Sequence, residues 1–181
     1  QRQMCIRDSL TTVKIDQKFQ EIIGDFYLRF CPTLAYKAPH LDQFGKGKTR
    51  IGFVSQNFRN HTVGRLYQGL IAQFNKRQWE VYVYASSNMD EVAHHIKSNC
   101  YAFRLLPVHL QGARDLIAAD QLDVLYYADI GMDTLTYFLA FARLAHVQCV
   151  SWGHAVPTGL RSIDYFISSK HLEIDDTITA D

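Results

Sequence analysis

From residue 50 onward, the chain alternates short apolar runs with segments in which apolar residues recur at helical spacing. The apolar runs, which we expect to be strands, cover residues 50–55, 79–85, 101–106, 122–127, 147–152 and 163–168. The helical segments cover residues 63–74, 90–98, 110–119 and 135–144. Strands alternating with helices are joined by right-handed crossovers. The pattern therefore predicts an α/β fold, with a Rossmann-like parallel sheet and helices on both faces.

The segment before this alternation has a different pattern. Residues 1–9 show no periodicity and are expected to be non-native or disordered, whereas residues 15–30 have the spacing of an amphipathic helix that Pro32 ends. Residues 31–48 read as a linker. We therefore expect a helical connector over residues 10–48 and one lobe over residues 49–181, which ends in an acidic segment without a closing element.

Composition narrows the classes of partner. A chain of 181 residues with 48% hydrophobic side chains can bury one good core. The net charge of +1 and the lack of a long basic run argue against a nucleic-acid partner. No apolar run approaches the roughly 20 residues of a membrane helix, and the four dispersed cysteines indicate neither a zinc site nor a disulfide framework. We expect no membrane partner and a cytoplasmic location.

Ligands of such sheets bind beyond the carboxyl ends of the strands, so the loops there are the candidate site. The first, residues 55–62, lacks both the dinucleotide and the P-loop glycine patterns. It carries His61 where a helix begins, and an imidazole there can act as a base, a donor or a ligand for sugar hydroxyls. The alternative is that Asn60 or His61 merely caps the helix.

Two later loops also carry polar side chains. Asp129 and Asp133 follow the fourth expected strand and could bind a metal or act as bases, although Asp133 stands where a helix cap belongs, and we favour that role. The loop from residue 153 onward combines His154 and Thr158 with two glycines that permit close backbone approach. The alternative for His154 is a partly buried structural histidine.

Four ordered blocks of sequence resemble one known family. They are RIGFVSQNFRNHTVG (50–64), LDVLYYADIGMD (122–133), QCVSWGH (148–154) and SIDYFISS (162–169). These blocks resemble the O-linked N-acetylglucosamine transferase and SPINDLY-like glycosyltransferases, family 41, over residues 49–176. The resemblance implies the first lobe of a two-lobed GT-B enzyme, with tetratricopeptide helices upstream. It also implies that these residues cover only that lobe, and that the other lobe, which is missing here, would hold most of the nucleotide.

The same resemblance implies roles for individual residues. His61 matches a histidine considered as a catalytic base, and Asp115 matches an acidic residue discussed in that role. Asn60, His154, Thr158 and Gly159 fall in the loops that would bind the substrate. The chain departs from the family pattern after His154, where Ala155 stands in place of a proline that comes only at Pro157.

The function that this resemblance implies is inverting sugar transfer without a metal or any cofactor. A nucleotide sugar, UDP-GlcNAc or UDP-glucose, would donate to a Ser, Thr or Asn side chain of a protein acceptor. A non-catalytic flavodoxin-like binding or response module is the alternative. It explains the alternation and Asp129 but not the two histidine-bearing loops, which a parallel sheet would bring to one rim.

Overall fold

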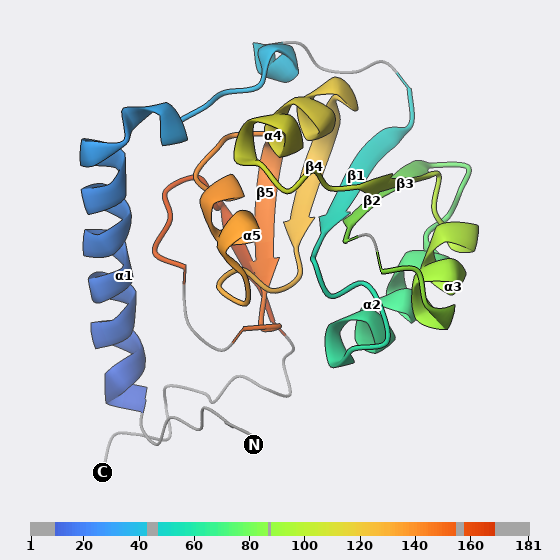
Figure 1. Cartoon of the computed structure of the whole chain (residues 1–181), viewed down its shortest axis with the longest axis horizontal. Helices are drawn as coiled ribbons and strands as arrows, with labels where there is room; N and C mark the ends of the chain where they lie inside the picture. Colours follow the sequence, from blue (N-terminus) through green and yellow to red (C-terminus); the bar gives the residue numbers. More distant parts are fainter. Residues whose placement is uncertain (1–9, 43–46, 87, 155–157, 169–181) are drawn as a thin grey trace.

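A computed structural model describes residues 10–42, 47–86, 88–154 and 158–168, with side chains from residue 17 onward (Figure 1). Three expectations concern residues outside these ranges: those for residues 1–9, for the shifted position of the proline within 155–157, and for the acidic end of the chain. The strands are β1 (Thr49–Val54), β2 (Trp79–Ala85), β3 (Ala102–Leu105), β4 (Leu122–Tyr127), β5 (Ala145–Ser151) and β6 (Tyr165–Ile167). They form one parallel sheet in the order β3-β2-β1-β4-β5-β6.

The helices cover both faces of this sheet, which confirms the predicted fold class. They are α1 (Leu10–Phe30), α2 (Thr62–Gln73), α3 (Glu91–Asn99), α4 (Leu110–Ala119) and α5 (Thr134–Leu139), with short 3-10 turns η1 (Pro32–Leu34) and η2 (Pro39–Asp42). Helices α2 and α3 pack on one face through a cluster that includes Phe53, whereas α4 and α5 pack on the other through a cluster that includes Tyr84. None of the helices in the described ranges is both long and apolar enough to span a membrane.

The last helix is shorter than its sequence pattern suggests, because a buried glutamine captures the backbone that follows it. The side chain of Gln148 accepts from the Leu144 amide (2.7 Å) and donates to the carbonyls of Ala142 (3.0 Å) and Ser162 (2.9 Å). Those backbone groups are therefore satisfied outside a helix. The prediction of a helix to residue 144 is wrong for this reason, since α5 ends at Leu139.

The connector helix α1 lies along one side of the sheet, beside α5 (Figure 1). Its Tyr27 makes edge contacts with Phe138 (5.2 Å between ring centroids) and Phe141 (6.0 Å). Gly159, with φ of +60°, lies so close to α1 that an added Cβ would stand 2.5 Å from the backbone nitrogen of Glu21. A residue with a side chain would be both strained and blocked there, so the connector is packed onto the lobe.

One buried histidine makes the stability of this packing depend on pH. His40, in η2, contacts the Leu122 carbonyl through Nε2 (3.2 Å), and burial lowers its pKa below the ordinary 6.5, with His146 adding to the effect. Because the folded-state pKa lies below the unfolded one, the stabilisation is present above pH 6.5 and lost as the pH falls through the folded value. We expect the urea midpoint to fall between about pH 7 and pH 5, and to fall less in His40→Gln; equal falls would contradict this assignment.

Candidate functional site

The site lies where the strand order reverses, at the carboxyl ends of the neighbouring strands β1 and β4. This reversal is the place at which open α/β sheets bind their ligands. The strand order β3-β2-β1-β4-β5-β6 is the order of dinucleotide-binding Rossmann sheets. It differs from the flavodoxin order, which is 2-1-3-4-5. Because all strands are parallel, the loops after β1, β4 and β5 emerge on one rim, as expected for the loops that carry His61 and His154.

A buried carboxylate joins the first two loops. Oδ2 of Asp129 accepts hydrogen bonds from the Ser55 hydroxyl (2.9 Å) and from the Asn57 side-chain amide (2.8 Å). The Asn57 backbone amide donates in turn to Ser55 Oγ (2.8 Å). Burial raises the pKa of Asp129, while the bonds from Asn57 and Ser55 oppose that rise. At 1% exposure, Asp129 is an internal group and not a surface ligand.

His61 is the N-cap of α2, as one of the two alternatives for this residue proposed. Its backbone is extended, and its Nδ1 accepts from the Val63 amide at 3.3 Å. A backbone amide can only donate, so Nδ1 carries a lone pair, and the proton of the neutral ring sits on Nε2. The half-buried imidazole therefore presents an N–H donor. It lies close enough to Asp129 for the two side chains to interact electrostatically.

Asn60 is exposed beside His61, and its backbone amide and side-chain oxygen are engaged within the protein. Its backbone amide donates to Asp90, the N-cap of α3, and its side-chain oxygen accepts from Arg65 Nε (2.9 Å). Asn60 thus ties the first loop to α2 and α3, and its expected role in binding substrate stays a prediction.

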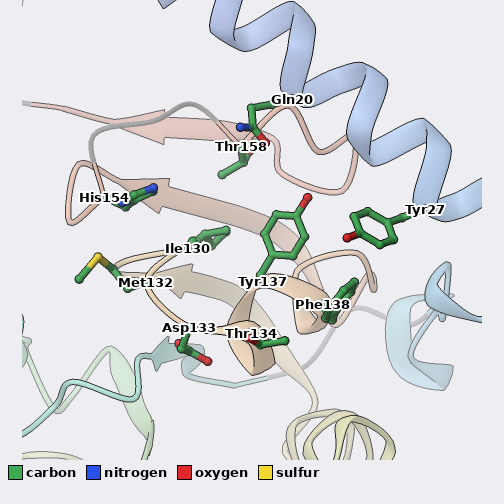
Figure 2. Close-up of a pocket in the computed structure, with 11 residues that line it drawn as sticks. Gln20, Tyr27, Ile130, Met132, Asp133, Thr134, Tyr137, Phe138, His154 and Thr158 are labelled. Carbon is green, nitrogen blue, oxygen red and sulfur yellow. The ribbon is translucent and has the colours of Figure 1, made fainter. Parts of the chain in front are cut away.

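A cavity of about 460 Å³ opens on the same rim, between the lobe and α1 (Figure 2). Helix α1 contributes Gln20 and Tyr27, the segment after β4 contributes residues 130–133, and α5 contributes Thr134, Tyr137 and Phe138. His154 and Thr158 form the remaining wall, and Figure 2 shows Thr158 beside Gln20 and the ring of Tyr137 facing Tyr27. Aromatic walls with a few polar groups are typical of small-molecule sites.

The structure brings two of the expected binding residues into this cavity and places a third behind it. His154 packs on Gly131, whose φ is +100° and where an added Cβ would stand 2.6 Å from the imidazole. Thr158 lies in the same wall, and its hydroxyl accepts weakly from the Leu160 amide (3.4 Å). Gly159 instead contacts the backbone of α1, which gives it a packing role whether or not it also meets substrate.

The two remaining carboxylates lie apart from the buried network. Asp133 caps α5, as favoured from the sequence, since its Oδ1 accepts from the Thr136 amide at 2.9 Å. Asp115 lies on the exposed face of α4, where it accepts from Gln111 (2.8 Å), and it does not line the cavity. Its catalytic role stays a prediction. Within the described ranges, no three His, Cys, Asp or Glu side chains are grouped so as to hold a metal ion.

Several residues of the site escaped sequence reasoning. Gln20 and Tyr27 belong to the connector, and nothing in the local pattern shows that it folds back on the lobe. Ser55 and Asn57 stood in a loop already singled out, yet their partner Asp129 is over 70 positions away. The Rossmann strand order, which places the first and fourth strands side by side, is the signal that could have joined them.

Known proteins share both the sequence pattern and the fold. A sequence model of glycosyl transferase family 41 matches residues 27–174. A solved structure of a mutant O-GlcNAc transferase from Thermobaculum terrenum is similar, with a TM-score of 0.67 and 24% identity over 86% of this chain. The chain spans 31% of the length of that protein. No curated protein matched. Because the family match covers most of the chain, the chain belongs to glycosyl transferase family 41.

Proposed function

We propose that this lobe forms one wall of the active site of an inverting transferase that moves GlcNAc or glucose from a UDP donor to a Ser, Thr or Asn side chain of a protein, without a metal ion. The observation that carries the proposal is the cavity on the carboxyl rim, which His154 and Thr158 line together with aromatic side chains. Membership in a glycosyltransferase family supports the reaction class.

The cavity has the chemistry that a sugar requires. Sugar hydroxyls need donors and acceptors, which the imidazole of His154, the hydroxyl of Thr158 and the amide of Gln20 supply. The apolar face of a sugar ring can pack on an aromatic ring, and the cavity is lined by Tyr27 and Tyr137, whose rings meet edge to face with centroids 6.3 Å apart. A volume of about 460 Å³ lies within the usual range for small-molecule sites.

The position of His61 as the N-cap of α2 favours one chemical role of its imidazole over another. In the transfer, the acceptor hydroxyl oxygen bonds to the anomeric carbon while its proton passes to the departing diphosphate. The bond from that carbon to the diphosphate breaks, and the nucleotide leaves with the electron pair. A neutral His61 that caps α2 offers Nε2–H. We therefore assign it as a hydrogen-bond donor to the sugar or the departing diphosphate. Action as the base that removes the hydroxyl proton would require the cap to be released.

A second lobe is part of the proposal. The leaving diphosphate needs cations and helix N-termini around it, and the described rim offers the N-terminus of α2 with its half-buried neighbour Arg59. The similar solved structure is about three times as long as the stretch that this chain covers. We propose that a second lobe closes the cleft and holds most of the nucleotide, so that the present residues alone bind UDP weakly and transfer little sugar.

Donor and acceptor are tested by transfer assays on the full-length protein in EDTA buffer, with UDP-GlcNAc, UDP-glucose and a GDP sugar offered to peptides bearing Ser, Thr or Asn. His154→Ala and Thr158→Val are expected to raise the KM for the donor about 2- to 10-fold, the loss of one hydrogen bond. His94→Ala and Thr33→Val are matched controls at exposed positions outside the cavity. Transfer from none of the donors, or equal KM values in all variants, would contradict the proposal.

A further inference from the structure

Two sets of buried polar contacts meet at the strand ends beneath the rim. In the first, Asp129 Oδ2 holds Ser55 and Asn57 of the loop that leads to His61. The carbonyl of Asp129 also accepts from the Met132 amide (3.1 Å), which closes a turn that lines the cavity. One residue thus binds the His61 loop on one side and the cavity segment on the other.

The second set holds α2 against β5. The Tyr67 hydroxyl of α2 hydrogen-bonds Ser151 at the end of β5, and Ser151 donates to the Ala128 carbonyl (3.2 Å). Gly153 then passes so close that an added Cβ would stand 2.0 Å from that carbonyl oxygen and 3.1 Å from Cβ of Asp129. The loop bearing His154 is therefore seated directly on residues 128 and 129.

The other oxygen of Asp129 is an unusual feature of the site. Oδ1 is fully buried and has no hydrogen-bond partner among the described residues. An apolar side chain would avoid the cost of burying an unpaired acceptor, which is about 1–3 kcal/mol. A carboxyl that is kept in spite of this cost, at the point where three loops meet, indicates a role beyond filling the core.

We propose that Asp129 is a positioning residue that fixes the His61 loop relative to the cavity, so that the Nε2–H of His61 and the sugar-binding wall of His154 keep one geometry during transfer. This inference rests on the proposed function only for its kinetic readout. Misplacing reacting groups by about 1 Å can cost about 100-fold in rate, which is why a residue that touches no substrate can control kcat.

The kinetic test compares two changes at Asp129 in the full-length protein. Asp129→Ala removes both acceptor bonds and is expected to lower kcat about 10- to 100-fold, with little change in the KM for the donor. Asp129→Asn keeps a carbonyl oxygen that accepts from Ser55 and Asn57, so it is expected to recover most of the loss. Equal losses in the two variants, or a loss seen only in KM, would overturn the proposal.

A matched control separates positioning from simple stability. Asp120 is also a buried aspartate, and it accepts from the Tyr84 hydroxyl (2.8 Å) and from Arg104 (2.9 Å), but it precedes β4 and so lies at the opposite edge of the sheet. Asp120→Ala is expected to lower the unfolding temperature while kcat, measured well below that temperature, stays at the parent value. A fall in kcat equal to that of Asp129→Ala would show that the loss of any buried aspartate lowers kcat, and it would overturn the positioning role of Asp129.

Hydrogen exchange gives a readout that does not need activity. In Asp129→Ala, the backbone amides of Asn57 and Val63 are expected to exchange faster, whereas Asp120→Ala is expected to leave them unchanged. Uniformly faster exchange, or no change in the loop of residues 55–62, would reject Asp129 as the positioning residue. If the parent protein transfers no sugar, the proposed function fails, and this measurement still decides the role of Asp129.

Discussion

Replacing His61 with alanine is expected to lower kcat for sugar transfer about 100- to 1,000-fold, the effect of losing one donor aimed at developing charge. The same change removes the cap of α2, in which Nδ1 accepts from Val63. Loss of a cap costs about 1 kcal/mol, so the unfolding free energy should fall far less than the activation barrier rises. Transfer kinetics and urea unfolding on the same preparations check both halves of this expectation.

Two variants separate the imidazole from the cap. Asparagine is a strong N-cap residue, so His61→Asn should retain the stability of α2 and still lose most of kcat. His109→Ala is the matched control, because His109 caps α4 in the same way, with Nδ1 accepting from the Gly112 amide (3.0 Å), at the outermost strand of the sheet. If His109→Ala lowers kcat as much as His61→Ala, or if neither does, His61 has no place in the mechanism.

Replacing Gly64 with alanine is expected to disrupt the His61 loop and destabilise the chain by about 1–3 kcal/mol. Gly64 lies in the first turn of α2, where an added Cβ would stand 2.1 Å from the Arg59 carbonyl oxygen and 2.9 Å from that of Asn57. Both are backbone atoms, so the loop itself must shift. The variant should therefore lose transfer as well as stability, which urea unfolding and kcat together would show.

Gly69 provides the control within the same helix. An added Cβ at Gly69 would have nothing within 4 Å. Alanine is a better helix former than glycine by about 0.5–1 kcal/mol, so Gly69→Ala should stabilise the chain and leave kcat unchanged. The two substitutions are chemically identical, and only the contact with the loop differs. Equal effects on stability would show that the loop does not lie against Gly64 as described.

The sequence alone determined the elements and the sheet type. Apolar runs of strand length alternate with helical spacing because each strand must be buried on both faces and each helix on one. That requirement is local, so the six strands and the helices after them were predicted within a few residues. The connector helix α1 begins five residues earlier than predicted, at Leu10. The helix that was predicted too long, α5, ends where the distant side chain of Gln148 bonds to the backbone that follows it.

The tertiary structure decided what surrounds the site. The loops bearing His61 and His154 could be placed on one rim from strand direction alone, because parallel strands share their carboxyl edge. Asp129 accepts hydrogen bonds from Ser55 and Asn57, and α1 packs against the lobe so that Tyr27 lines the cavity. Both features depend on contacts between residues far apart in the chain. No local pattern encodes such contacts, since they arise only when the strand order and the packing of the connector bring distant segments together.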